Sequence, residues 1–307
     1  MKHHTVGFLG FGKAACIFAE DMLAAGFGDI VIYDKNWNVE PFGSTIRQNA
    51  ERLSARLVTS PSELAAQASM VLSMVVPVSS EEALKSVAPF LSDGTFYIDL
   101  NSVSPVTKKR SSEFAHEVNP LLHYIDGCIL GAVSENRIRT PILLCGRESE
   151  GAEEFLARCG AKIEVIDGEP GDASAVKMIR SVFMKGIETL FIETLHAAQA
   201  YNIQKQVVAT IKDTFETLTF DQLINMLVTT HSIHGKRRQG EMMEVIDTLI
   251  AKNVDATMSQ GIYRKFGWSV NLKLSEYFEG SLPDRLETVI ETIYNRAKES
   301  SFIENLI

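Results

Sequence analysis

The sequence has few cysteines, and their spacing excludes two classes of protein. Four cysteines stand at positions 16, 128, 145 and 159. They show neither CxxC nor zinc-ligand spacing, and they are too few for a disulfide scaffold. We therefore expect reduced thiols, a cytoplasmic protein and no metal.

Basic residues are in deficit. The 307 residues include 30 Lys and Arg against 39 Asp and Glu, a net charge of -9. Nucleic-acid binders need a concentrated basic face that displaces counterions from phosphates. Nucleic acid is therefore not an expected partner, and small molecules are.

Long apolar runs are also missing. The longest run, residues 69–78, is well short of the roughly 20 residues that a membrane-spanning helix needs. It predicts a buried strand, and we expect no membrane association. The first strand-like run begins at Thr5, so we expect no signal peptide.

What the first half does contain is an alternation of short β-rich runs with helical patterns. This alternation predicts a parallel sheet covered by helices. Three helix starts carry capping residues, Ser60-Pro61, Ser79-Ser80 and Ser104-Pro105, the second as a capping box. The expected strands are residues 5–10, 30–34, 70–76, 95–99, 124–128, 142–145 and 162–165.

A glycine-rich loop follows the first strand. Residues 10–15, Gly-Phe-Gly-Lys-Ala-Ala, match GxGxxA and precede an apolar helical run. Glycines let the backbone approach a pyrophosphate, and the helix N-terminus supplies N–H donors. Asp34 ends the second strand, where a carboxylate accepts hydrogen bonds from ribose hydroxyls and repels a 2′-phosphate. NAD is therefore favoured, although Lys13 and Lys35 could hold that phosphate, which leaves NADP open.

We expect the cofactor-binding set to include later strand ends as well as this loop. The expected residues are Gly10, Phe11, Gly12, Lys13, Ala14, Asp34, Lys35, Val76, Pro77 and Asn101.

From Gly171 the alternation stops, and apolar residues recur at helical spacing to about Tyr201. The rest of the chain is also helical in pattern, with a break at residues 280–283. The expected fold is α/β. A Rossmann-type doubly wound sheet in residues 1–170 is linked by a long helix to an all-α substrate and dimerisation domain in residues 171–307.

Three segments then follow in a fixed order: Asp-Leu-Asn-Ser-Val-Ser-Pro at 99–105, Asp-Gly-Cys-Ile-Leu-Gly-Ala-Val at 126–133, and residues 171–181 with Lys177. Together they resemble motifs of the β-hydroxyacid dehydrogenases, the family of 3-hydroxyisobutyrate and 6-phosphogluconate dehydrogenases. The resemblance covers the first 200 residues. It implies that Ser102 binds substrate, that Gly131 and Ala132 offer N–H groups to its carboxylate, and that Lys177 moves the proton.

The expected reaction itself requires a proton-transfer group such as this lysine. Hydride transfer at a carbinol carbon requires proton transfer at its oxygen, and a lysine can serve if burial or nearby cations lower its pKa. Arg180 is such a neighbour, and Ser181 shares the helix face of Lys177. Lys185 lies about 12 Å of helix rise further on, so only one lysine can contact the reacting oxygen. A solvated lysine near a helix start is the alternative.

Two features depart from the family. Arg180 stands where relatives have asparagine, so the anionic end of the substrate is held differently or is larger. Residues 231–242 replace the usual C-terminal element, and His234 and Arg238 lie among adjacent cations there. That cluster can bind a carboxylate or phosphate, in its own or a partner subunit, or can be a solvated helix face. The pattern is typical of a less characterised branch with a phosphogluconate-dehydrogenase-like C-terminal domain.

The expected function is an NAD(P)-dependent oxidoreductase of the β-hydroxyacid dehydrogenase type. It is expected to act as a homodimer or higher homo-oligomer on a 3-hydroxy acid, a polyhydroxy (sugar) acid or the matching carbonyl compound. The alternatives are an imine or other carbonyl reductase and a non-catalytic dinucleotide sensor. The expected substrate-binding residues are Ser102, Gly131, Ala132, Arg180, Ser181, His234 and Arg238, with Lys177 catalytic.

Overall fold

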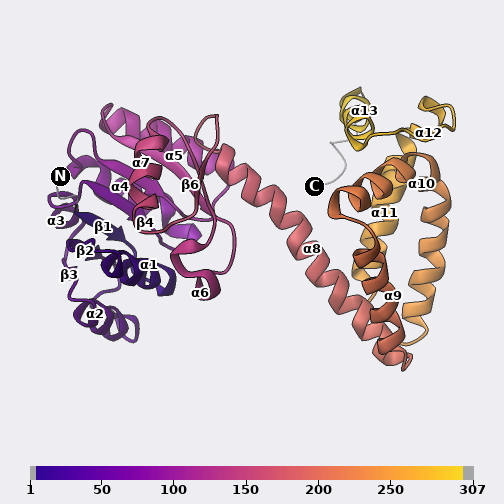
Figure 1. Cartoon of the computed structure of the whole chain (residues 1–307), viewed down its shortest axis with the longest axis horizontal. Coiled ribbons are helices and arrows are strands. Elements are labelled where there is room, and N and C mark those ends of the chain that lie inside the picture. Colours follow the sequence, from indigo (N-terminus) through magenta and orange to yellow (C-terminus); the bar gives the residue numbers. More distant parts are fainter. Residues whose placement is uncertain (1–4, 300–307) are drawn as a thin grey trace. The chain divides into compact units, whose positions relative to one another are not determined.

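The computed structural model describes residues 5–299. The chain divides into two compact units, Met1–Val182 and Phe183–Ile307, and each is described by itself (Figure 1). The first holds a sheet between helices, and the described part of the second is helical. The predicted α/β fold with a helical second part is confirmed. The first four residues, on which the signal-peptide expectation depends, lie outside the described residues.

The sheet unit contains eight strands in the order β3-β2-β1-β4-β5-β6-β7-β8. The chain first runs outward from β1 and then returns to its other side with β4, so the order reverses between these two central strands. In an open α/β sheet, ligands bind beyond the carboxyl ends of the strands at such a reversal. The strands are β1 Val6–Leu9, β2 Ile30–Tyr33, β3 Arg56–Leu57, β4 Met70–Ser73, β5 Phe96–Asp99, β6 His123–Ile129, β7 Ile142–Cys145 and β8 Ile163–Val165.

Two details of the sheet differ from the sequence prediction. The strand β3 was not predicted, because two residues are too short to show a periodicity. The sheet is also not wholly parallel, since β7 pairs antiparallel with β6 and β8 runs with β7. The direction of a strand depends on the connection that precedes it, which the composition of the strand does not record.

Helices cover both faces of the sheet. One core cluster joins α1, α2 and α7 to strand residues such as Phe8 and Ile32. The other joins α3, α4 and α5 to residues such as Leu9 and Val71, which point the opposite way. All residues of β1 and β4 are buried, as expected for strands covered on both faces. The helices are α1 Lys13–Ala24, α2 Phe42–Arg52, α3 Pro61–Ala65, α4 Ser80–Val87, α5 Pro105–Val118, α6 Val133–Asn136 and α7 Ser149–Ala157, with the 3-10 turns η1 Pro77–Ser79, η2 Ala88–Phe90 and η3 Arg137–Arg139.

Two of the three predicted helix caps are confirmed. The hydroxyls of Ser60 and Ser104 accept hydrogen bonds from the N–H groups of Glu63 and Thr107, at 3.2 Å each. The capping box at Ser79 is wrong, because its hydroxyl makes no cap bond. The 3-10 turn η1 precedes α4 and turns this hydroxyl toward Lys35, whose ammonium donates to it at 3.0 Å.

The predicted long helix is α8, Asp172–Ala200, with 29 residues. The two units divide between Val182 and Phe183, inside this helix. The functional division at residue 170 stays a prediction. The later helices are α9 Gln204–Thr217, α10 Phe220–Ile250, α11 Thr257–Asn271, α12 Leu274–Tyr277 and α13 Leu286–Glu299.

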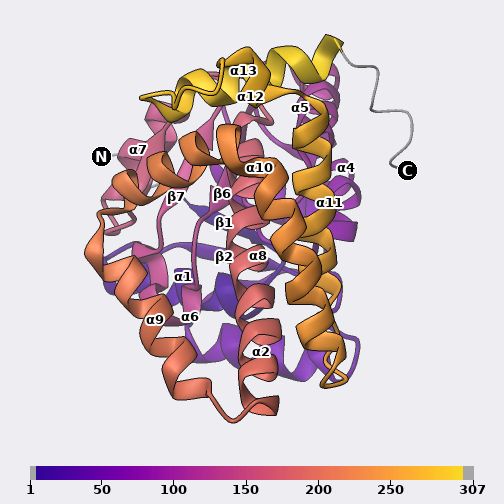
Figure 2. The same ribbon diagram turned by 90° about the vertical axis from the view of Figure 1, so that its right-hand side faces the viewer.

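In the helical unit, α10 packs against α11 and α13 (Figure 2). The hydroxyl of Thr219 and the side chain of Gln222 form a capping box at the start of α10. At the start of α11, the buried carboxylate of Glu193 accepts the N–H groups of Met258 and Ser259, at 2.7 and 2.9 Å. A local capping box therefore fixes the start of α10, and a side chain from α8 fixes the start of α11. Within the described residues, no helix is both long and apolar enough to span a membrane.

Candidate functional site

The loop after β1 requires glycine at its first position. Gly10 has φ +88°, and an added Cβ would lie 2.6 Å from Cγ1 of Val75 and 2.8 Å from the carbonyl oxygen of Met74. Neither contact is tolerable for a carbon atom. The N–H of Gly10 donates to the carbonyl of Tyr33 at 2.8 Å. The loop is thus pressed against the segment after β4, at the reversal of the strand order.

Gly12, unlike Gly10, is not required by close packing. It is the N-cap of α1, and an added Cβ there would have no neighbour within 4 Å. Because glycine has no side chain to cap the helix, the first N–H groups of α1 face this open space. Backbone donors and the positive end of the helix dipole favour an anion there. The loop therefore fits the pyrophosphate of a dinucleotide.

Asp34 joins the ends of β1 and β2. One of its carboxylate oxygens accepts the N–H of Phe11 and the other accepts the N–H of Asn36, at 2.8 Å each. A carboxylate can accept about four hydrogen bonds, so lone pairs are left for ribose hydroxyls. Asp34 thus holds the loop in shape and keeps acceptors for a ligand.

A cavity of about 920 Å³ lies over these elements, a size in the range of cofactor sites. Of the predicted cofactor residues, it is lined by Gly10, Phe11, Gly12, Lys13, Asp34, Lys35 and Val76. Besides its bond to Ser79, Lys35 forms an ion pair with Glu82 at 3.5 Å. A ligand phosphate would have to compete for Lys35, and this favours a ribose without a 2′-phosphate.

Ala14, Pro77 and Asn101 are not among the lining residues. Asn101 is 2% exposed. Its amide oxygen accepts the N–H of Val75 at 2.7 Å, and its amide nitrogen donates to Ser73 at 2.9 Å. Asn101 therefore supports the backbone of a residue that lines the cavity. Its direct contact with a cofactor stays a prediction.

Lys177 and Ser102 come together within the sheet unit. The ammonium nitrogen of Lys177, in the second turn of α8, donates to the hydroxyl oxygen of Ser102 at 2.6 Å. Ser181 donates to the carbonyl of Lys177 at 2.8 Å, and Arg180 is exposed. The predicted proton donor and the predicted substrate-binding hydroxyl are therefore neighbours.

Gly131 and Ala132 are exposed and precede α6. Arg137, which follows α6, ties this segment to the nucleotide-binding helix. Its guanidinium contacts Asp21 of α1 at 2.7 Å, and the N–H of Ile138 donates to the same carboxylate at 2.9 Å. The segment expected to bind the substrate carboxylate is thus anchored on α1.

His234 and Arg238 lie on α10 in the helical unit. His234 is exposed, while Arg238 donates to the hydroxyl of Thr230 at 2.9 Å. On the same helix, His231 stacks on Phe266 and its Nε2 lies 2.7 Å from the hydroxyl of Ser269. Burial, reinforced by Arg238 and Lys265, lowers the pKa of His231. The part of His234 and Arg238 in substrate binding stays a prediction.

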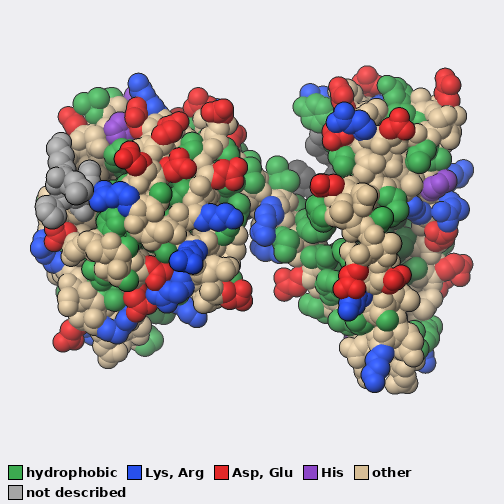
Figure 3. All heavy atoms as spheres, viewed as in Figure 1, with side chains coloured by type: hydrophobic (Ala, Val, Ile, Leu, Met, Phe, Trp, Pro, Cys, Tyr) green, Lys and Arg blue, Asp and Glu red, His purple; other side chains and the backbone are tan. Residues whose placement is uncertain are grey.

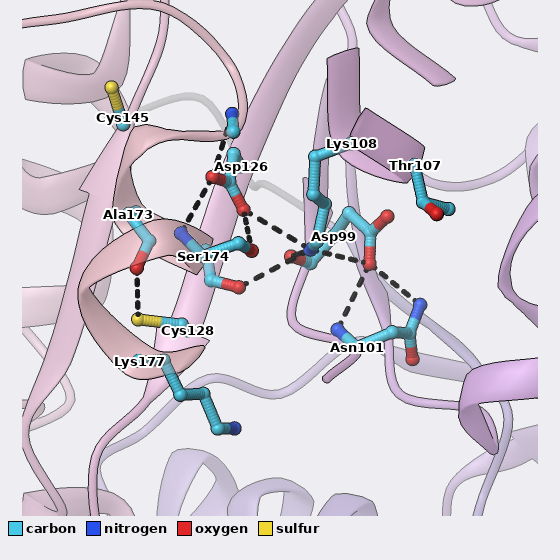
Figure 4. A network of polar contacts seen from close by, with 12 residues as sticks. Asp99, Asn101, Thr107, Lys108, Asp126, Cys128, Cys145, Ala173, Ser174 and Lys177 are labelled. Atoms are coloured by element: carbon cyan, nitrogen blue, oxygen red, sulfur yellow. Dashed lines mark hydrogen bonds and ion pairs between the residues drawn. The ribbon is translucent and has the colours of Figure 1, made fainter. Parts of the chain in front are cut away.

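A buried charged cluster, unforeseen from the sequence, lies beside Lys177 in the sheet unit (Figure 4). Lys108 is 0% exposed. Its ammonium lies 3.0 Å from a carboxylate oxygen of Asp99 and 3.3 Å from one of Asp126. Lys108 stands in a polar stretch of α5 whose sequence predicts exposure to solvent. Only its contacts in the structure show that it is buried. The two aspartates open the segments 99–105 and 126–133, and the family resemblance gives neither of them a role.

The four cysteines are buried and free. Burial raises the pKa of Cys145 and of Cys159 to about 11, which keeps both as unreactive thiols. Among residues 5–299, no group of three or more His, Cys, Asp or Glu side chains is arranged to hold a metal ion.

Comparison with protein families gives two matches. The NAD binding domain of 6-phosphogluconate dehydrogenase matches residues 5–167. A domain of unknown function, DUF1932, matches residues 198–268. An uncharacterised 28.5 kDa protein of Methanothermus fervidus is 24% identical over 253 residues, which are 82% of this chain and 94% of that protein.

Solved structures agree over most of the chain. A conserved hypothetical protein of Sinorhizobium meliloti is 29% identical, with a TM-score of 0.58 over 96% of this chain and 97% of its own. The conserved protein MTH1747, described as of unknown function and similar to 3-hydroxyacid dehydrogenases, is also 29% identical, with a TM-score of 0.57 over 90% and 99%. An imine reductase of Myxococcus stipitatus in complex with NADP+ has a TM-score of 0.74 over 94% and 99%, but 16% identity. At that identity the likeness concerns the fold alone.

Proposed function

Because the chain belongs to the family of the NAD binding domain of 6-phosphogluconate dehydrogenase, we propose that it is an NAD(P)-dependent oxidoreductase acting on a 3-hydroxy acid or a polyhydroxy acid. The observation that carries the proposal is the 2.6 Å hydrogen bond between Lys177 and Ser102. A nicotinamide cofactor supplies the hydride acceptor or donor. This chain must then supply the proton transfer and the binding of the acid.

Lys177 performs the proton transfer in this proposal. In the oxidation direction its neutral amine takes the hydroxyl proton while the carbon loses hydride, so that a carbonyl group forms. In the reduction direction its ammonium returns the proton to the oxygen. Ser102, already in contact with Lys177, donates to or accepts from the same substrate oxygen and fixes its position.

The acid group is held by two further elements. The exposed backbone at Gly131 and Ala132 offers N–H groups to a carboxylate, as relatives of this family are expected to do. Arg180, three residues after Lys177, adds a fixed positive charge and a planar fork that suits a carboxylate or phosphate. A larger or more anionic acid than 3-hydroxyisobutyrate is therefore the favoured substrate.

NAD is the favoured cofactor of the two. Asp34 offers acceptors for ribose hydroxyls, and Lys35 is engaged by Ser79 and Glu82. A non-catalytic dinucleotide sensor is the alternative that is not an enzyme. It would need the cofactor loop but neither Lys177 nor Ser102. A lysine paired with a serine suits proton transfer to or from a hydroxyl oxygen. Imine reduction involves no such oxygen, so an imine reductase is disfavoured.

We also propose a cytoplasmic homodimer. In the helical unit, large apolar side chains are exposed on several helices, among them Ile192 at 64% and Phe220 at 61%. Figure 3 shows hydrophobic side chains among the exposed atoms of this unit. Exposed apolar side chains that gather into a patch mark protein contacts, and we infer that these side chains lie in the dimer interface. Light scattering after size exclusion would give the mass in solution, and a monomer at micromolar concentration would contradict the dimer.

The test is a substrate panel with NAD and with NADP, run on the wild type, on Lys177→Ala and on the control Lys185→Ala. Hydroxy acids, sugar acids and ketone-amine mixtures make up the panel. We expect turnover of an acid that falls about 100-fold or more in Lys177→Ala and much less in the control. Turnover of imines alone would favour the reductase, and tight NAD binding without any turnover would favour the sensor.

A further inference from the structure

We propose that Asp126 is a positioning residue that fixes the geometry of the Lys177–Ser102 pair through the start of α8, with Lys108 and Asp99 completing the link. This inference rests on the proposed function, because it takes Lys177 to be the proton-transfer residue. Nothing in the sequence motifs assigns Lys108 a role, and the hydrogen bonds of Asp126 go to the backbone and hydroxyl at the start of α8.

Asp126 acts as a helix cap supplied from another element. It lies on β6, and one carboxylate oxygen accepts the N–H groups of Gly171 and Ser174, at 2.9 and 3.0 Å. The other oxygen accepts the hydroxyl of Ser174 at 2.8 Å. These donors lie at the start of α8, just before it and in its first turn, where N–H groups have no partner within the helix. A carboxylate is also stabilised by the positive end of the helix dipole.

Lys108 ties this cap to the loop that carries Ser102. Its ammonium contacts Asp126 of β6 and Asp99 of β5, and it donates to the backbone carbonyls of Asp99 and Gly127. Asp99 in turn accepts the backbone N–H of Asn101 at 2.9 Å. Lys108 thus bonds to both strands that lead into the site. With all three side chains at most 1% exposed, such charges hold geometry tightly, because no water can replace a lost partner.

Both members of the reactive pair therefore depend on one cluster. Ser102 follows Asn101 directly, and Lys177 lies one turn beyond Ser174. The start of α8 also has no room to shift toward α5, since an added Cβ on Gly171 would lie 2.9 Å from the carbonyl oxygen of Pro105. Figure 4 shows the cluster between α8 and the segment that carries Asn101.

Loss of this cluster should affect proton transfer but not cofactor binding. A displaced α8 start would lengthen the contact between Lys177 and Ser102, and proton transfer falls steeply when such a contact lengthens. The partners of Asp126 are Gly171, Ser174 and Lys108, and none of these lines the cofactor cavity, so cofactor affinity should not change. Loss of Asp126 should therefore lower kcat without weakening NAD binding, whereas general unfolding would reduce both.

The test compares Asp126→Asn and the milder Ser174→Ala with the control Glu193→Gln. The control also replaces a buried carboxylate that caps a helix start, but the helix is α11. Three quantities are measured on the full chain: the Kd for NAD, kcat and KM for the best acid of the panel, and the pH dependence of Lys177 acetylation by mass spectrometry, relative to Lys185.

We expect Asp126→Asn to lower kcat about 10-fold or more, to leave the Kd for NAD within about twofold, and to shift the acetylation profile of Lys177. Ser174→Ala should change the same quantities in the same direction by less. Glu193→Gln should leave the Lys177 profile unchanged. If Asp126→Asn does not fold, Ser174→Ala decides.

An unchanged Lys177 profile in the folded variants would overturn the positioning role. The acetylation profile needs no turnover, so it also separates the two proposals. A shifted profile in a protein that oxidises no acid would refute the proposed reaction and leave the positioning role supported.

Discussion

The ammonium of Lys177 and the hydroxyl of Ser102 lie 2.6 Å apart, although the two residues are 75 positions apart in the chain. One comes from the start of a long helix and the other from the loop after β5. No local pattern links them, and only the fold of the sheet unit brings them together. This contact is the basis of the first prediction.

Ser102→Ala should lower kcat/KM about 10-fold, because a hydrogen bond to a charged group is worth about 1.5–3 kcal/mol. The Tm should change little, since Ser102 is exposed. Ser104→Ala is the matched control. It removes the cap of α5 and costs about 1 kcal/mol of stability, with kcat/KM retained. Wild-type kcat/KM in Ser102→Ala would contradict its role.

The two glycines of the nucleotide loop should respond differently to the same change. Gly10→Ala should lower the free energy of unfolding by about 1–3 kcal/mol, because φ is positive and the added carbon meets Val75 and Met74. Gly12→Ala should leave the unfolding free energy nearly unchanged and weaken NAD about 10-fold or more, by filling the space at the start of α1. Denaturant unfolding and a fluorescence titration with NADH measure the two effects. Undiminished NAD affinity in Gly12→Ala would place the pyrophosphate elsewhere.

Asp34→Ala should weaken NAD by about 10-fold and shift the preference toward NADP. The change removes ribose acceptors, the clamp on Phe11 and Asn36, and the charge that repels a 2′-phosphate. Dissociation constants for both cofactors give the ratio. Asp29→Ala, an exposed residue before β2, should leave it unchanged. A wild type that prefers NADP outright would refute this interpretation of Asp34.

Lys108→Met should destabilise the sheet unit by about 3–5 kcal/mol, because it leaves Asp99 and Asp126 buried without their cation. Lys109→Met changes the exposed neighbour on the same helix and should stay within about 0.5 kcal/mol of the wild type. Urea unfolding compares the two. Equal midpoints would mean that water or a proton compensates the buried carboxylates.

The helical unit should lose stability in mild acid through His231. Burial lowers the pKa of His231 below its ordinary value of 6.5, so the folded state favours the neutral ring. Below about pH 6.5 the unfolded chain binds the proton more readily, and this stabilisation is lost as the pH falls through the folded-state pKa.

His231→Gln should therefore reduce the loss of unfolding free energy between about pH 7 and about pH 5. His234→Gln, on the same helix but exposed, keeps the buried ring and should follow the wild type. The same pH dependence in all three proteins would assign the acid effect to other groups.

The sequence predicted the features that local chemistry determines. The resemblance to β-hydroxyacid dehydrogenases is confirmed, as are the glycine-rich loop before α1, the two proline-containing helix starts and the long α8. Each depends on neighbouring residues only. The glycine at position 10 could be assigned because a strand, a turn and a helix follow one another there.

Features that depend on distant contacts could not be predicted in the same way. Lys108 has the flanking residues of an exposed lysine, and its burial follows from aspartates on two strands. The capping box at Ser79 failed because Pro77 begins a 3-10 turn first. The reversal of β7 reflects a connection of 12 residues or so, and no property of the strand itself.

The complete burial of Lys108 also makes this side chain a reporter of how often the sheet unit opens. An amine at 0% exposure cannot react with a reagent in water until the surrounding structure opens. The rate at which Lys108 is modified therefore reports openings of the sheet unit, either their rate or their equilibrium population, depending on how quickly the unit closes again. A single peptide that contains Lys108 would thus measure how often the sheet unit opens under native conditions.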